Sequence, residues 1–298
     1  MDHSSPVSWK GYSGRSRAGV EPSRLYDLFG EGPLKGLPQS ERTQLVKKKP
    51  DKGSHVYVTH LDVGFGEEEL FIKTFDTSLW VGVLKDRMLS REGMKRPHHY
   101  PIKLAKMLYE ESLAKRCWRA AGMCEENNIP VAAHLLYLSK GLGWARKEVL
   151  VTRGVNPRSA GDARQYFTRE FKPPVSYEKA RRKEELLKKL GALVRDVHHL
   201  NVVFQDFKLH NMVLQEGKEG YTYHLIDLSE VDPGKRGDKE PVFLERFIPS
   251  MIKTGAIDND DLALFIKSYI EAGVSDTRTV EEVMSPVRDR AASMGRKI

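Results

Sequence analysis

Cysteine is scarce in this sequence, which limits how the chain can be cross-linked. Cys117 and Cys124 are the only two in 298 residues, and they lie seven positions apart in a segment with helical periodicity. Two cysteines cannot complete a zinc site by themselves, and a disulfide along one helix face has poor geometry. We therefore expect two reduced thiols, as in a cytosolic protein.

Long apolar runs are also missing. No stretch approaches the roughly 20 apolar residues that a membrane-spanning helix needs. The first residues, Met-Asp-His-Ser-Ser, contain no basic segment followed by an apolar run, which is the pattern of a secretory signal. The expected location is the cytoplasm.

Basic residues outnumber acidic residues in this chain. The chain has 49 Lys and Arg against 41 Asp and Glu, a net charge of +8. A basic surface suits nucleic acid, an anionic membrane face or a phosphorylated substrate, or it serves solubility alone. No basic-aromatic platform and no zinc-ligand spacing support nucleic-acid binding, so no nucleic-acid partner is expected.

Hydrophobic periodicity predicts a strand-rich first part and a mostly helical second part. Residues 1–42 are rich in Ser, Gly, Pro and Arg without sustained periodicity, and we expect a flexible N-terminal arm there. The expected strands are 43–47, 55–60, 69–75, 132–138, 148–152, 202–204, 211–215 and 221–228, with turns marked by Gly and Pro. The expected helices are 102–127, 161–171, 177–200, 242–253, 258–272 and 279 onward.

This order predicts an α+β fold of two unequal lobes. The N-lobe covers residues 43–155 and contains the one long helix. The C-lobe covers residues 156–298 and is mainly helical.

Four polar residues stand out in the second part. Asp206, Lys208 and Asn211 lie in a loop between short apolar strands, and Asp227 ends the next strand. Such residues are common in loops, and a D-x-K-x-x-N match alone arises by chance. The flanking strand-turn-strand and the Leu-Ile-Asp context make the whole pattern much rarer, and its Asp-to-Asn spacing is that of the kinase catalytic loop.

Phosphoryl transfer requires groups of these kinds. Asp206 would orient or deprotonate the acceptor hydroxyl, and Lys208 would stabilise charge on the transferred phosphoryl group. Asn211 and Asp227 would hold Mg²⁺, a hard ion that takes carboxylate and amide oxygens. The pattern thus predicts a kinase that uses ATP and Mg²⁺.

A kinase also needs contacts to the nucleotide from its other lobe. Lys73 ends an otherwise apolar strand, and contact with the α- and β-phosphates would give it a partner. The alternative is an edge-strand lysine that points to water. Glu111 lies on the apolar stripe of the long helix and is the candidate partner of Lys73, with Glu110 the weaker one. An exposed, solvated Glu111 is equally consistent with the pattern.

The region where a glycine-rich loop belongs holds little glycine. Only Gly53, followed by Ser54, lies between the first two predicted strands. Backbone amides there could cover phosphates. A simple hairpin turn explains the same residues.

The sequence resembles the lipopolysaccharide core kinases, which include Kdo kinases and heptose kinases, over residues 43–272. The resemblance implies a protein-kinase-like fold and phosphorylation of a sugar hydroxyl on a core glycolipid at the inner face of the cytoplasmic membrane. A basic surface suits that anionic partner. The segments that resemble the family are 70–73, 114–121, 128–131, 149–155, 197–201, 206–214, 226–228 and 264–270.

The chain departs from the pattern in three places, one of which is an irregular basic insertion at residues 79–101 without a clear counterpart. Phe204 and Gln205 stand where the pattern has His-Arg, and Cys117 stands where some relatives have the helix glutamate. Two alternatives to a sugar kinase therefore stay open: an atypical protein or small-molecule kinase, and a pseudokinase that binds nucleotide as an interaction module. The missing A-P-E segment disfavours a conventional protein kinase. The complete set of polar residues disfavours a pseudokinase.

Overall fold

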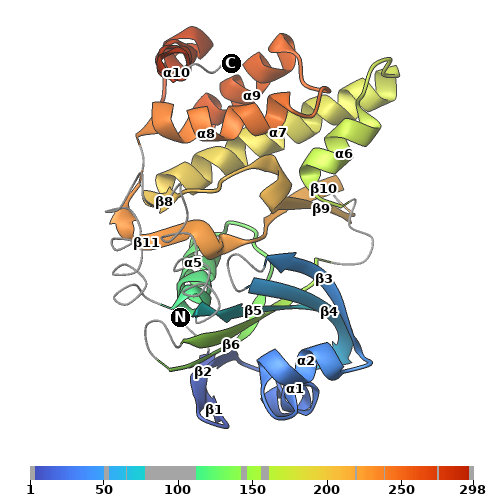
Figure 1. Ribbon diagram of the computed structural model, residues 1–298. Helices are drawn as coiled ribbons and strands as arrows, with labels where there is room; N and C mark the ends of the chain where they lie inside the picture. The colour runs from blue at the N-terminus through green and yellow to red at the C-terminus, as the bar shows by residue number, and fades with distance from the viewer. Residues whose placement is uncertain are drawn as a thin grey trace, which may run out of the picture. The chain divides into compact units, whose positions relative to one another are not determined.

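A computed structural model of the chain describes residues 4–49, 54–64, 66–77, 112–141, 146–155, 161–218, 220–237, 239–273 and 275–294. The chain divides into two compact units. The first comprises Met1–Arg119 and Ala133–Gly154, and the second comprises Ala120–Ala132 and Val155–Ile298. Strands and helices occur in both units, which confirms the predicted α+β class (Figure 1).

The first unit is built on one antiparallel sheet of seven strands, in the order β1-β2-β6-β7-β5-β4-β3. Every strand predicted in this part is confirmed within a few residues. The strands are β1 Ser4–Trp9, β2 Tyr12–Arg17, β3 Thr43–Lys49, β4 Ser54–Asp62, β5 Glu67–Asp76, β6 His134–Lys140 and β7 Lys147–Arg153. The buried side chains of β4, β5, β6 and β7 form the centre of the core of this unit.

The expectation of a flexible arm over residues 1–42 is wrong for the described part of that segment. Residues 4–17 form the hairpin β1–β2, and β2 pairs with β6 from Ser13↔Ser139 to Ser16↔Leu136. Two short helices follow, α1 (Pro22–Phe29) and α2 (Pro33–Gln39). Pairing with a strand more than 100 residues away determines this structure, so local periodicity does not reveal it.

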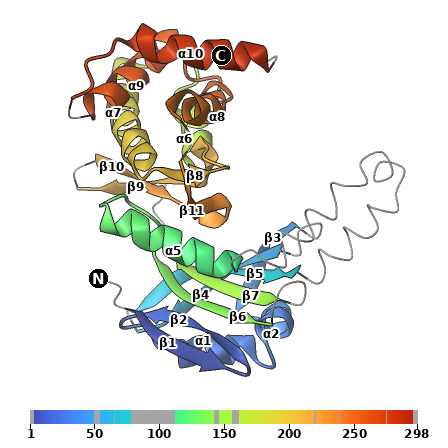
Figure 2. The same cartoon turned by 90° about the vertical axis from the view of Figure 1, so that its left-hand side faces the viewer.

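The hairpin β1–β2 lies beside α1 (Figure 2), and aromatic side chains pack between them. The ring of Trp9 stacks on Tyr26 at 5.1 Å between centroids and meets Phe29 at 5.6 Å. Gly14 permits the pairing with β6, because a Cβ atom there would lie 1.8 Å from the carbonyl oxygen of Tyr137. The described part of this segment, residues 4–39, thus contributes directly to the core of the first unit.

Phe29→Ala is expected to destabilise the first unit by about 3–5 kcal/mol, because Phe29 is fully buried and the substitution leaves a cavity. Calorimetry should show a lower melting temperature. Asp27→Ala, on the exposed face of the same helix, is the matched control and should change stability by less than about 0.5 kcal/mol. Equal melting temperatures for the two variants would mean that α1 does not pack as described.

Helix α5 (Leu113–Glu126) packs its first turns on one face of the sheet. Ala114 and Cys117 contact Phe75, Tyr137 and Leu150 in a small cluster of their own. Both cysteines are buried, and neither belongs to a disulfide. The predicted helix began at residue 102; residues 102–111 lie outside the described part of the chain.

The second unit contains five further helices around one core: α6 Ala163–Glu170, α7 Tyr177–His199, α8 Glu240–Ile252, α9 Asn259–Glu271 and α10 Val280–Ser293. All five were predicted. Capping boxes begin α9, with Asp258 and Asp261, and α10, with Thr279 and Glu282. The apolar stripe of α7, centred on Leu190, packs against α9 (Figure 1).

Two small antiparallel ladders complete this unit. β9 (Met212–Gly217) pairs with β10 (Gly220–Leu225), and β8 (Val202–Phe204) pairs with β11 (Val231–Arg236). The predicted strand 221–228 ends earlier, at Leu225. β11 was not predicted, because its Asp-Pro-Gly composition is typical of a turn and only its pairing with β8 makes it a strand.

Candidate active site

The loop between β8 and β9 alternates buried and partly exposed residues. Phe207 and Leu209 are buried, whereas Asp206, Lys208 and His210 are partly exposed. The short 3-10 helix η4 (Leu209–Asn211) closes the loop. This alternation holds the loop to the core on one side and presents its polar side chains on the other.

Two contacts anchor the buried side of the loop. The ring of Phe207 lies 5.0 Å from both Phe243 and Phe247 of α8. The backbone N–H of Leu209 donates to the hydroxyl of Ser250 at 2.9 Å. Helix α8 therefore fixes the backbone from which the polar residues project.

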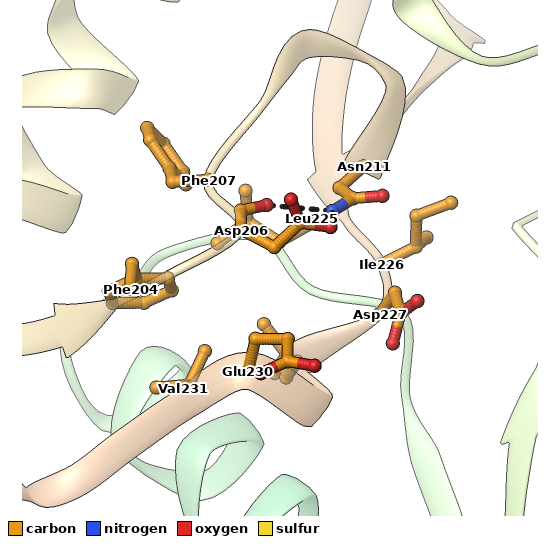
Figure 3. A pocket seen from close by; sticks show the side chains of 10 residues that line it. Phe204, Asp206, Phe207, Asn211, Leu225, Ile226, Asp227, Glu230 and Val231 are labelled. Atoms are coloured by element: carbon orange, nitrogen blue, oxygen red, sulfur yellow. Dashed lines mark hydrogen bonds between the residues drawn. The ribbon is translucent and has the colours of Figure 1, made fainter. Parts of the chain in front are cut away.

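Asp206, Lys208 and Asn211 contact one another directly. The amide Nδ2 of Asn211 donates to the backbone carbonyl of Asp206 at 2.8 Å and to its carboxylate at 3.3 Å (Figure 3). Lys208 forms an ion pair with the same carboxylate. Partial burial would raise the pKa of Asp206, but the contacts with Lys208 and Asn211 outweigh it and lower the pKa below the ordinary value. Asp206 is therefore ionised at neutral pH.

The register of the β9–β10 ladder determines where Asp227 lies. The ladder ends at the pair Met212↔Leu225, and the next backbone bond joins the N–H of Ile226 to the carbonyl of Asn211 at 2.9 Å. Asn211 therefore lies opposite Ile226, and Asp227 follows one residue later. This pairing brings the loop and the end of the hairpin together.

Asp227 adopts a left-handed backbone conformation, with φ 51° and ψ 63°. Residues other than glycine rarely adopt it, although Asp and Asn tolerate it best. The hydroxyl of Ser229 donates to the Asp227 carboxylate at 2.6 Å. A strained backbone at an exposed carboxylate is typical of functional sites.

The second ladder holds the other end of the site. Phe204 pairs with Val231, and the N–H of Gln205 donates to the carbonyl of Glu230 at 3.1 Å. The segment before Asp206 is therefore hydrogen-bonded to the segment after Asp227. Phe204 and Gln205 depart from the kinase pattern. In this structure the ring of Phe204 is buried, and Gln205 contributes the backbone hydrogen bond to Glu230.

A pocket lies between these segments (Figure 3). Carboxylates and an amide line one part of it, and apolar side chains line the rest. Its lining residues are Phe204, Asp206, Phe207, Asn211, Leu225, Ile226, Asp227, Leu228, Glu230 and Val231.

The donors in this pocket suit Mg²⁺. Because Asn211 donates through Nδ2 to Asp206, its Oδ1 is turned away from that residue (Figure 3). This oxygen and the Asp227 carboxylate are the hard ligands that Mg²⁺ prefers. No group of three or more His, Cys, Asp and Glu in the described ranges could hold a metal alone.

In the first unit, Lys73 lies at the centre of the sheet. It pairs with Val56 of β4 on one side and with Leu150 of β7 on the other. The alternative of an edge-strand lysine is therefore wrong. Ser54 lies opposite Phe75, two residues from Lys73 along β5, so Ser54 and Lys73 share one face of the sheet.

Two predicted site residues, Gly53 and Glu111, lie outside the described residues. Their expected contacts with phosphates and with Lys73 stay predictions. Sequence reasoning also missed two residues of the second unit: Ser229, which holds Asp227, and Glu230, which lines the pocket. Their position directly after the Leu-Ile-Asp segment was the available signal.

Comparison with known families identifies the chain. A model of the lipopolysaccharide kinase (Kdo/WaaP) family matches residues 103–269, more than half of the 298 residues. The chain belongs to this family. The matched range includes Asp206, Lys208, Asn211 and Asp227. No curated protein matches the chain.

Solved structures agree on the fold. The structure described as "WaaP in complex with acyl carrier protein" is similar to the chain, with a TM-score of 0.60 and 15% identity. The match covers 92% of this chain and 97% of the other. At this identity the likeness shows a kinase-like fold. Family membership makes the chain a phosphotransferase, a sugar kinase of the lipopolysaccharide core.

Proposed function

We propose that the protein transfers the γ-phosphate of ATP, with Mg²⁺, to a hydroxyl of a Kdo or heptose sugar in lipopolysaccharide core or a related glycolipid. The observation that supports this most is the pocket in which Asp206, Asn211 and Asp227 meet, within the range matched by a sugar-kinase family. A kinase family uses a nucleotide as phosphate donor. ATP is the donor for which this loop pattern is typical.

Asp206 orients the acceptor hydroxyl in this proposal. Its lowered pKa makes it a weak base, so it does not deprotonate the sugar before reaction. It accepts the proton as the new O–P bond forms and the bond between the β-γ bridging oxygen and the γ-phosphorus breaks. ADP leaves with that oxygen. Lys208, which is paired with Asp206, would stabilise charge on the transferred group.

Asn211 and Asp227 are the proposed ligands of Mg²⁺, which when bound neutralises charge on the β- and γ-phosphates. In the first unit, Lys73 is the proposed contact to the α- and β-phosphates, and Gly53 and Ser54 are proposed to cover the phosphates. Glu111 is the proposed partner of Lys73.

The acceptor class is tested by offering core glycolipid and a generic protein in parallel to the purified enzyme, with labelled ATP and Mg²⁺. Label on the glycolipid supports the proposal. Label on protein alone would replace it with an atypical protein kinase. If neither acceptor is labelled, a separate Mg·ATP binding assay distinguishes an acceptor of another kind, when nucleotide still binds, from a pseudokinase, when none binds.

The anionic membrane face is the proposed location of this reaction, with the enzyme attached peripherally in the cytoplasm. Among the described residues, no helix is long and apolar enough to cross a bilayer. The edge strand β3 exposes 47% of Leu45 and 56% of Val46 directly before Lys47, the first of three consecutive lysines. Apolar side chains beside lysines suit an interface with anionic lipid, where each lysine contributes about 1 kcal/mol.

The double substitution Leu45→Ser with Val46→Ser is expected to reduce binding to anionic lipid vesicles about tenfold or more, because two exposed apolar side chains are lost from the contact. Cosedimentation measures it. Ile252→Ser, at an exposed apolar residue of α8, is the matched control and should bind as the wild type does. Equal binding of all three proteins would exclude β3 as the membrane contact.

A further inference from the structure

Helix α6 begins beside the loop that holds Asp206. Asp162, directly before the helix, forms an isolated bridge with Val213 of β9, and the N–H of Leu214 donates to the carbonyl of Gly161 at 3.5 Å. Ala163, the first helical residue, is fully buried in the same core as Leu209 and Met212. The first turn of α6 is therefore held against η4 and the start of β9.

This placement brings a second group of charges to the site. His210, within η4, lies close enough to Asp206, Lys208, Asp162 and Arg164 to feel the charge of each. An imidazole can donate a hydrogen bond to an anionic oxygen through a ring nitrogen that carries a proton.

Arg164 is exposed and lies in the first turn of α6. The nearby carboxylates have other partners: Asp162 accepts from the N–H of Gln165 at 2.9 Å to cap α6, and Asp206 is paired with Lys208. Over the part of the chain that the structure describes, Arg164 forms no ion pair. An exposed arginine is often only solvated, but this one lies in the first turn of α6, which is held against η4 and the start of β9.

We propose that Arg164 and His210 bind an anionic group of the acceptor, a carboxylate or a phosphate, next to the hydroxyl that Asp206 orients. This inference rests on the proposed sugar-kinase function. A guanidinium matches both groups because its N–H donors form two parallel bonds with two oxygens. The pair would thus select charged sugars and set which hydroxyl reaches Asp206.

The test is the acceptor dependence of Arg164→Ala. With a charged acceptor, the variant should raise the acceptor KM about 10–100-fold, the effect of one lost charge-assisted contact, and leave the KM for ATP unchanged. With an acceptor whose anionic group has been removed, wild type and variant should have equal KM values. Reduction of the carboxyl group and enzymatic removal of phosphate are two separate arms, and the arm that abolishes the difference identifies the group.

Arg169→Ala is the matched control, since Arg169 lies on the same helix and pairs with Glu170 at 2.8 Å. It should leave the acceptor KM unchanged. Three results for Arg164→Ala would each overturn the assignment. They are an equal rise of KM for charged and neutral acceptors, a change in the KM for ATP alone, and no change in any KM. If the wild type transfers phosphate to no core glycolipid, the sugar-kinase proposal itself fails, and with it this acceptor site.

Discussion

Asp206→Ala is expected to lower kcat about 10²–10⁴-fold, the usual range for losing a positioned acid-base group. The fold should survive, because the side chain is 37% exposed and its ion pair with Lys208 is of the surface kind, which contributes about 0–1 kcal/mol. The buried neighbours Phe207 and Leu209 continue to hold the loop. Steady-state transfer from labelled ATP gives kcat, and thermal unfolding monitors the fold.

A matched control separates this effect from the loss of any charged pair. Glu184→Ala removes a carboxylate that pairs with Lys188 on the exposed face of α7. It should keep wild-type kcat. If Asp206→Ala turns over as fast as Glu184→Ala, Asp206 has no part in the reaction.

Asp227→Asn is expected to remove the Mg²⁺ dependence of nucleotide binding. The substitution keeps the size of the side chain, and Asn tolerates the left-handed backbone that this position requires. What is lost is the negative charge of the ligand that would face the metal, so the Kd of Mg·ATP should rise about 10–100-fold. Isothermal titration calorimetry measures the Kd with Mg²⁺ and with a chelator.

Wild-type protein should bind much more tightly with Mg²⁺ than with chelator, and Asp227→Asn should bind equally weakly in both. Asp289→Asn makes the same change at an exposed carboxylate of α10 and should behave as the wild type does. An undiminished effect of Mg²⁺ in Asp227→Asn would exclude this residue as a metal ligand.

The second unit could be predicted closely because its signals are local. Helix periodicity and the spacing from Asp206 to Asn211 depend on residues near one another in the chain. The left-handed conformation of Asp227 and the strand β11 could not be predicted in this way. Both depend on pairing of residues after Asp227 with β8, a contact that local composition does not report.

The first unit shows the same limit at its N-terminus. Residues 4–17 have the composition of a loop, and they form strands because β6 offers an edge and Trp9 packs on α1. The sequence likewise did not determine whether the strand that contains Lys73 lies inside the sheet or at its edge. Only the order of the seven strands, with β5 between β4 and β7, decides it.

The most direct test of the sugar-kinase proposal is to locate the phosphate in the product. Core glycolipid is incubated with the enzyme, Mg²⁺ and ATP, and the isolated sugar is analysed by ³¹P and ¹H nuclear magnetic resonance. We predict a new phosphate monoester on a core sugar hydroxyl with the wild type and none with Asp206→Ala. A product without a sugar phosphate, or the same ester formed by both proteins, would contradict the account.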